Sequence, residues 1–151
     1  MTQVTESKIE EFSRELLDAQ RTRSGIEPLT ERADLSVREA YEIQLHGVEQ
    51  RCANGARVTG KKIGLTSRAM QNLIGVDQPD YGHLLDTMAY TDGATIPTDR
   101  LLLPRMEAEI AFVFDRTLDG PGVTTLDIAE ATRAVYPALE VVDSRVRDWD
   151  I

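Results

Sequence analysis

Hydrophobic residues recur at helical spacing in two segments of the N-terminal third of the chain. Phe12 and Leu16 lie in the first segment, over residues 7–21, and Tyr41 and Leu45 lie in the second, which begins at residue 37. Apolar positions three or four residues apart form one stripe along a helix. The pattern therefore predicts two amphipathic helices, each of which needs a partner that covers its apolar stripe.

Both predicted helices begin with residues that are typical of a capping box. Ser7 is followed three residues later by Glu10, and Ser36 is followed in the same way by Glu39. In a capping box the serine hydroxyl accepts from the backbone N–H of the glutamate, and the glutamate accepts from the backbone N–H of the serine. We therefore expect the two helices to start at Ser7 and Ser36.

From residue 57 the pattern changes to short apolar runs separated by glycine and proline. Such runs predict strands in EAEIAFVF and in ALEVVDSR. Helical spacing predicts a short helix in SRAMQNLIG, capped by Ser67, and another in TLDIAEATRAVY that stops at Pro137. The segment DQPDYGHLL has the composition of a turn.

Together these elements predict an α+β fold in a single domain. N-terminal helices occupy residues 1–56, and the first part of a mostly β body occupies residues 57–151. The last segment, SRVRDWDI, provides no strand or helix that would cover the edge of a sheet. We therefore expect the body to be truncated at its C-terminus.

Composition and charge narrow the class of protein. The chain has 151 residues, of which 41% are hydrophobic and 28% charged, as in an ordinary globular domain. The net charge of −9 argues against nucleic acid as a partner, because phosphates require a basic surface. A single cysteine, no signal peptide and no apolar run of roughly 20 residues predict a cytoplasmic protein that does not cross a membrane.

Three glutamates are candidates for a metal site. Glu107 and Glu109 are two residues apart in one predicted strand, so their side chains share a face, and Glu140 lies in the other predicted strand. Carboxylates that meet away from water need a counter-charge, which a hard cation such as Mg²⁺ supplies. An acid pair in a strand is also typical of a solvated face, and spacing alone does not bring Glu140 to the pair.

Four segments carry a resemblance to a known family. In order, GKKIGLTSRAM, GVDQPDYGHL, LPRMEAEIAFVF and PALEVVDSRVRDWD closely resemble the 2-hydroxypenta-2,4-dienoate (2-oxopent-4-enoate) hydratases of meta-cleavage aromatic catabolism. These enzymes belong to the fumarylacetoacetate hydrolase superfamily. The resemblance is closest from residue 57 onward. It implies a barrel-like, mostly β body, a homo-oligomer, and a further segment after the R-D-W motif that completes the body.

The resemblance also implies roles for single residues. Glu107, Glu109 and Glu140 would bind Mg²⁺ or Mn²⁺, while Lys62 of K-I-G-L-T and Asp80 of Q-P-D-Y-G would be catalytic. Outside the motifs, the two residues have simpler interpretations, because Lys62 is typical of a solvated lysine and Asp80 of a turn. Only one of two adjacent strand residues can face a site, so Lys62 enters it without its neighbour.

Three further polar residues are weaker candidates. Thr66 and Ser67 lie where the short helix is predicted to start, and their hydroxyls are candidates to bind a substrate carboxylate. His83 is an alternative acid or base, although a histidine in a loop is a weak signal.

The implied reaction is the addition of water to 2-hydroxypenta-2,4-dienoate, which gives 4-hydroxy-2-oxopentanoate. The metal would withdraw charge from the 2-oxygen, and Lys62 and Asp80 would move protons. The open alternatives are a 2-oxo-3-hexenedioate decarboxylase, a hydratase of a seven-carbon diacid, and a non-catalytic subunit that associates with a pathway decarboxylase or aldolase. A diacid would need an additional cation in the pocket.

Overall fold

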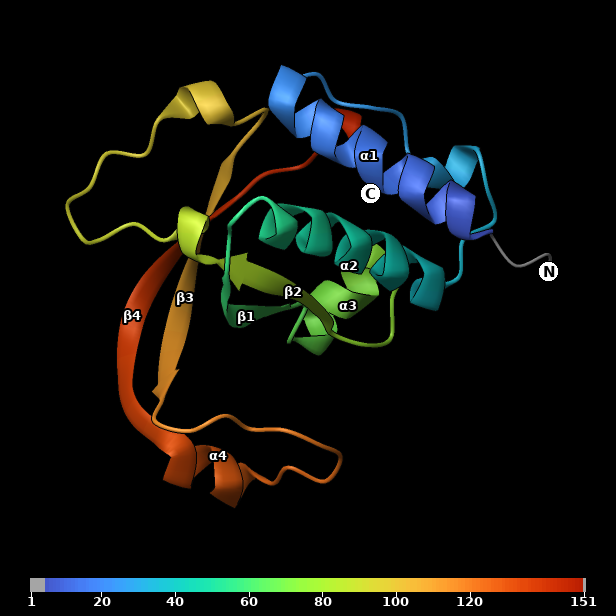
Figure 1. Cartoon of the computed structure of the whole chain (residues 1–151). Coiled ribbons are helices and arrows are strands. Elements are labelled where there is room, and N and C mark those ends of the chain that lie inside the picture. Colours follow the sequence, from blue (N-terminus) through green and yellow to red (C-terminus); the bar gives the residue numbers. More distant parts are fainter. Residues whose placement is uncertain (1–4, 151) are drawn as a thin grey trace.

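A computed structural model describes residues 5–150, which contain four α-helices and four strands besides short 3-10 turns (Figure 1). The helices are α1 (Glu6–Thr22), α2 (Val37–Ala53), α3 (Arg68–Ile74) and α4 (Thr125–Ala131). The strands are β1 (Val58–Gly64), β2 (Asp80–Leu85), β3 (Arg105–Phe114) and β4 (Thr132–Val142). The predicted α+β class is confirmed in this part of the chain.

The starts of the two long helices show one capping prediction confirmed and one wrong. At α2, the Ser36 hydroxyl accepts from the Glu39 N–H at 3.3 Å, and the Glu39 carboxylate accepts from the Ser36 N–H at 2.9 Å. Helix α1 instead starts at Glu6, with Thr5 as its N-cap and no capping bond from a side chain. Ser7 therefore lies within the first turn, where its hydroxyl cannot act as the cap.

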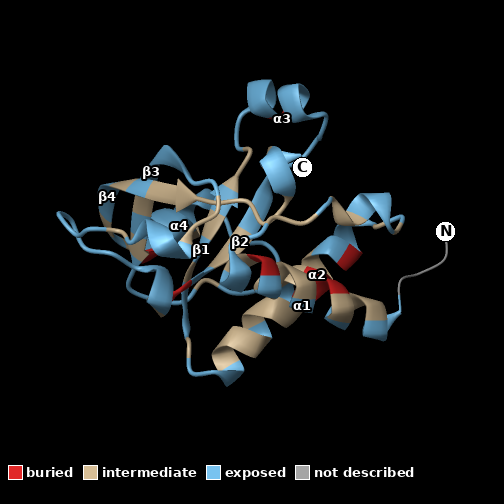
Figure 2. Ribbon diagram, turned by 90° about the horizontal axis from the view of Figure 1, so that it is seen from above, coloured by how far each residue is buried: buried red, intermediate tan, exposed pale blue. Residues whose placement is uncertain are grey.

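Helices α1 and α2 pack against each other and bury Phe12 of the predicted α1 stripe, but the α2 prediction is wrong in part, because Leu45 of the predicted stripe is 38% exposed. Phe12 is fully buried on α1, and Ile43 is 3% exposed on α2. The two backbones approach closely at Gly47, where a Cβ atom would lie 3.2 Å from the Ser13 hydroxyl. Figure 2 shows that buried residues gather at this helix pair and beside β2, while much of the remaining surface is exposed.

Strands β1 and β2 form an antiparallel pair, with Lys62 opposite Gly82 and Gly64 opposite Asp80. The segment from Asp80 to Leu85 is thus a strand, and the predicted turn is wrong there. Successive side chains of this segment point to opposite faces of the strand, and one of these faces lies against α2. The Tyr81 ring stacks on Tyr41 of α2 with centroids 4.2 Å apart, so α2 supplies a tertiary contact that turn propensity does not include.

Strands β3 and β4 form a second antiparallel pair, called here the β3–β4 ribbon. The predicted helix over residues 125–136 ends early, at Ala131, and β4 runs on through Pro137. The residues after Ala131 include Val135 and Tyr136, whose side chains favour a strand that pairs with a neighbour. Pro137 is tolerated because a two-stranded ribbon has only edge strands, where a missing N–H donor can be accommodated.

The barrel-like body that the resemblance implies is not closed in the described residues. The β1–β2 pair and the β3–β4 ribbon share no ladder, so two separate two-stranded sheets are present. Most of β3, the strand that carries Glu107 and Glu109, is exposed. No other strand in the described range pairs with the ribbon to cover it.

The end of the described chain returns to the N-terminal helices. Ile26 pairs with Val146 in a parallel bridge, and the backbone N–H of Arg147 donates to the Ile26 carbonyl at 2.8 Å (Figure 1). The division of the chain between residues 56 and 57 stays a prediction. None of the helices in residues 5–150 is both long enough and apolar enough to span a bilayer.

Candidate metal centre

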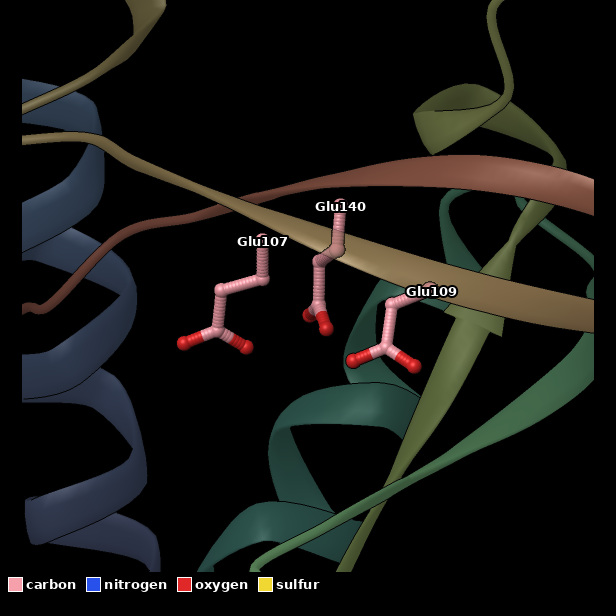
Figure 3. Close-up of side chains that lie close together, drawn as sticks. All are labelled: Glu107, Glu109 and Glu140. Carbon is pink, nitrogen blue, oxygen red and sulfur yellow. The ribbon is translucent and has the colours of Figure 1, made fainter.

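The three predicted metal ligands lie together on one face of the β3–β4 ribbon. Glu107 is directly opposite Glu140, and Glu109 is opposite Ala138, one pair further along the same face. One carboxylate oxygen from each glutamate lies within 4.8 Å of those of the other two. Figure 3 shows the three side chains on the same side of the ribbon. We call these residues the glutamate cluster.

The glutamate cluster is open to solvent on one side. Glu107 and Glu109 are exposed, whereas only 21% of the Glu140 side chain is accessible. The expectation of three poorly solvated carboxylates is therefore wrong for two of them. Three oxygen donors at this spacing suit a hard divalent cation, and an open side leaves room for water or substrate oxygens. The donor set fits Mg²⁺.

Lys62 joins the β1–β2 pair to the glutamate cluster. Its Nζ atom lies 2.9 Å from the Oε1 atom of Glu140, and 29% of the lysine side chain is exposed. The pairing register places Lys61 on the other face of β1, opposite His83. Of the two adjacent lysines, Lys62 is therefore the one that faces the cluster, in agreement with the expectation that only one of them can.

Two glycines make room for the candidate catalytic side chains. A Cβ atom on Gly82 would lie 3.2 Å from the Cγ atom of Lys62, and one on Gly64 would lie less than 3.0 Å from the Oδ1 atom of Asp80. Lys62 and Asp80 thus share one face of the β1–β2 pair, each lying over the glycine opposite it. Sequence reasoning missed this role, although both glycines stand in the quoted motifs.

His83 is directed away from this arrangement. Its Nδ1 atom lies 3.2 Å from the side-chain oxygen of Gln44 on α2, and its neighbour Tyr81 stacks on the same helix. The face of the β1–β2 pair that carries His83 packs on α2, while the opposite face carries Lys62 and Asp80. The structure therefore does not bring His83 to the other candidates.

Thr66 and Ser67 lie in the short loop between β1 and α3. The Ser67 hydroxyl accepts from the backbone N–H of Met70 at 3.2 Å and caps α3, as predicted from the sequence. Thr66 is exposed and precedes this cap. A capping hydroxyl keeps one acceptor site and can donate elsewhere, so the substrate-binding role of both residues stays a prediction.

A large open cavity of about 2390 Å³ connects most of these groups. It lies between the N-terminal helices, the β1–β2 pair and the β3–β4 ribbon. Of the candidate residues, Glu107 and Ser67 do not line it, and those that do are Lys62, Thr66, Asp80, His83, Glu109 and Glu140.

Arginines add positive charge to the same cavity. Arg51 and Arg145 both line it. Burial lowers the pKa of Arg145, an effect that the Asp143 carboxylate opposes. Burial also lowers the pKa of Arg51, and the charge of Arg145 adds to that lowering. Because an arginine loses its proton only at very high pH, both side chains remain cations that attract an anionic ligand.

The loop before β3 is held by contacts from Asp143 and Trp149. The Asp143 carboxylate accepts from the backbone N–H groups of Leu102 and Leu103 at 2.7 and 2.8 Å. The Trp149 indole N–H donates to the Leu103 carbonyl at 2.9 Å, and the Arg105 guanidinium lies 4.2 Å from the Trp149 ring centre. These contacts fix the entry to the strand that carries Glu107 and Glu109.

Comparisons with known proteins agree with the fold and the motifs. No protein-family model matches the chain. A 2-hydroxypent-2,4-dienoate hydratase of Pseudomonas putida is 50% identical over 145 residues, which cover 95% of the chain and 65% of that protein. A 2-oxo-hept-4-ene-1,7-dioate hydratase of Escherichia coli is 45% identical over 117 residues, which cover 78% of the chain and 44% of that protein.

A solved structure shares the fold. The 4-oxalocrotonate decarboxylase of Pseudomonas putida G7, in complex with magnesium and adipate, matches 99% of the chain with a TM-score of 0.93 at 30% identity. The chain covers 57% of that protein. It thus spans between 44% and 65% of the length of these relatives. The extent of the sequence identity and the shared fold together confirm the predicted resemblance to the 2-hydroxypenta-2,4-dienoate hydratases of the fumarylacetoacetate hydrolase superfamily.

Proposed function

We propose that the chain is a metal-dependent hydratase that converts 2-hydroxypenta-2,4-dienoate to 4-hydroxy-2-oxopentanoate. The observation that carries the proposal is the glutamate cluster, whose carboxylate oxygens lie within 4.8 Å of one another beside the face of Lys62 and Asp80. A relative that is 50% identical over 145 residues is named a 2-hydroxypent-2,4-dienoate hydratase, which is this activity.

Glu107, Glu109 and Glu140 would hold the cation, either Mg²⁺ or Mn²⁺. Magnesium is supported by the solved relative, which is in complex with that ion. When bound, a divalent cation supplies positive charge that stabilises the negative 2-oxygen of the substrate. The exposed side of the cluster leaves space for the substrate carboxylate and its 2-oxygen to approach together.

Lys62 and Asp80 are proposed to move the protons. The first step removes the proton of the 2-hydroxyl and adds a proton at C5, which gives 2-oxopent-3-enoate. The second step adds hydroxide from water at C4 and a proton at C3. Asp80 is the base for the enol or for the water, and the Lys62 ammonium returns a proton or holds the substrate carboxylate. Thr66 and Ser67 are proposed to donate hydrogen bonds to that carboxylate.

A second candidate activity acts on a diacid. The decarboxylase structure contains adipate, a six-carbon diacid, and the Escherichia coli relative is named for a seven-carbon diacid. Arg51 and Arg145 line the cavity that also contains the glutamate cluster's Glu109 and Glu140. They supply the additional cations that a second substrate carboxylate would need.

Self-association is proposed as well. The outer face of the β3–β4 ribbon exposes large apolar residues, among them Ile110 at 65% and Leu139 at 69%. An exposed apolar face of this kind favours a protein interface. We therefore propose a homo-oligomer. The alternative is a non-catalytic subunit bound to a pathway decarboxylase or aldolase, and such a subunit would show no activity in the assay below.

The decisive assay adds 2-hydroxypenta-2,4-dienoate and Mg²⁺ to the chain and follows the ultraviolet absorbance of the diene. We expect loss faster than in buffer, abolished by a chelator and by Glu109→Gln. Asp119→Asn, which removes an acid outside the cluster, is the matched control and should retain the rate. Release of carbon dioxide from a six-carbon diacid, without loss of the dienoate, would favour the decarboxylase instead.

A Mn²⁺ titration separates the metal site from the activity. The Glu107→Ala/Glu109→Ala variant should bind Mn²⁺ at least about 100-fold more weakly than the unaltered chain, because two of three charged ligands are removed. Equal, weak uptake by both proteins would show that the glutamate cluster is only a solvated face.

A further inference from the structure

Gln71 is a buried polar residue on a helix that is otherwise exposed. Its exposed fraction is 4%. Its neighbours along α3 are open to solvent, and Figure 2 shows this helix in the colour of exposed residues. A buried amide requires hydrogen-bond partners, and Gln71 has them. Its side-chain N–H donates to the backbone carbonyl of Leu65 at 2.7 Å. The amide therefore reaches back from α3 to the loop that follows β1.

The residue that accepts this bond has an uncommon backbone conformation. Leu65 has φ 53°, in the left-handed region that side chains other than glycine disfavour. It lies between Gly64, which makes room for the Asp80 carboxylate, and Thr66, which lines the cavity. A disfavoured conformation persists only where surrounding contacts hold it, and the Gln71 bond is such a contact.

The side-chain oxygen of Gln71 is linked through Arg68 to the segment that leads into β2. The Arg68 guanidinium lies 3.3 Å from the Gln71 side-chain oxygen and 3.4 Å from the backbone oxygen of Asp77. These two contacts are long, but they join the two chain segments that flank α3. One segment ends at Thr66, and the other continues to Asp80.

We propose that Gln71 is a positioning residue of the active site. By holding Leu65 in the left-handed conformation, its amide fixes Thr66 and Gly64 relative to Asp80, and so sets the geometry of the groups that meet the substrate. This inference rests on the proposed function for its catalytic consequence, while its structural part stands on the Leu65–Gln71 contact alone.

The test compares Gln71→Ala with Asn72→Ala, its exposed neighbour on the same helix. We expect Gln71→Ala to lower kcat by about 10- to 100-fold, as a small misplacement of catalytic groups does, with Mn²⁺ affinity changed less than about twofold. Asn72→Ala should leave both values unchanged. The isosteric Gln71→Glu removes the donor and should reproduce the loss if Gln71→Ala folds poorly.

Leu65→Gly provides the test of cause, because glycine adopts the left-handed conformation at no steric cost. The Leu65→Gly/Gln71→Ala variant should recover a large part of the kcat lost in Gln71→Ala, whereas independent effects would add. Additive losses, or a Gln71→Ala variant that only melts at a lower temperature with kcat and KM unchanged, would overturn the proposal.

Hydrogen exchange tests the Leu65–Gln71 contact itself and does not require an enzymatic activity. The backbone N–H groups of residues 70 and 71 bond to Ser67, so exchange there reports whether the loop keeps its conformation. Faster exchange is expected in Gln71→Ala and not in Asn72→Ala. If the unaltered chain does not consume the dienoate, the proposed function fails, yet this exchange result still supports or refutes the Leu65–Gln71 link.

Discussion

The two strand pairs of the molecule differ in what supports the face that carries the candidate site residues. The β1–β2 pair turns Lys62 and Asp80 to the cavity and packs its other face on α2, through Tyr81 and His83. The β3–β4 ribbon carries the glutamate cluster on one face and exposes an apolar face on the other. Both pairs use strand alternation to place charged groups, but only the first has its back covered within the described residues.

The comparison shows how the site is assembled. The proposed proton-transfer groups come from a pair that is held by a helix, and the proposed metal ligands come from a ribbon that is held mainly at its entry, by Asp143 and Trp149. The Lys62–Glu140 ion pair connects the two. Experiments that act on one pair should therefore have effects that the other pair does not share.

The largest expected effect comes from Lys62→Met, which removes the charge that connects the two pairs. The rate of dienoate consumption should fall about 10²- to 10⁴-fold, as for the loss of a proton-transfer group. Mn²⁺ affinity should hold or increase, because Glu140 loses a competing cation. Assays of rate and of Mn²⁺ binding on the same preparation check both statements, and weaker Mn²⁺ binding would contradict the division of roles between the pairs.

A smaller effect is expected from Gly64→Ala on the β1–β2 pair. The added Cβ would lie less than 3.0 Å from Asp80 Oδ1, so the carboxylate must move and kcat should drop roughly tenfold or more. Gly60→Ala is the matched control on the same strand face, because its Cβ would meet Leu84 at an ordinary 3.8 Å. Similar kcat values for the two variants would show that the position of Asp80 is unimportant.

The exposed face of the β3–β4 ribbon should govern self-association. Ile110→Lys/Leu139→Lys places charge on it and should weaken association about tenfold, as measured by sedimentation equilibrium. Leu73→Lys/Leu126→Lys changes two residues that are equally exposed but lie on α3 and α4, and should have little effect. A chain that stays monomeric without any substitution would refute this interface.

The smallest effect concerns the pH dependence of stability at the end of the β1–β2 pair. The Arg57 backbone N–H, at 3.0 Å, and then the Arg57 guanidinium hold the pKa of Asp86 below its usual value. The stabilisation is therefore present above an unfolded-state pKa of about 3.9 and is lost as the pH falls through the lowered folded-state pKa. Asp86→Asn should lower the melting temperature at pH 7, and by progressively less as the pH is lowered below about 4, as scanning calorimetry can measure.

Local patterns predicted the parts of the fold that depend on neighbouring residues. The capping box of Ser36 and Glu39 and the Ser67 cap of α3 involve atoms within three residues, and both are present. The course of β4 through Pro137 was not predictable in this way, because pairing with β3 over its whole length outweighs the helical spacing of residues 125–136.

In the candidate site, too, the features set by neighbouring residues were predictable from the sequence, and those set by strand pairing were not. The shared face of Glu107 and Glu109 follows from the period of a strand, whereas the position of Glu140 depends on the register with β3, which the sequence of β4 alone does not contain. The roles of Gly64 and Gly82 were missed for the same reason, since each depends on the residue opposite it. The Leu65 conformation also depends on a contact with α3.

The anchors before β3 have a consequence for any shortened form of this protein. The candidate site residues all lie at or before Glu140, so a version that ended at Val142 would carry every one of them. It would lack Asp143 and Trp149, which hold Leu102 and Leu103 at the strand entry. Such a fragment would keep all of these candidate side chains but would lack the hydrogen bonds that hold the entry to β3.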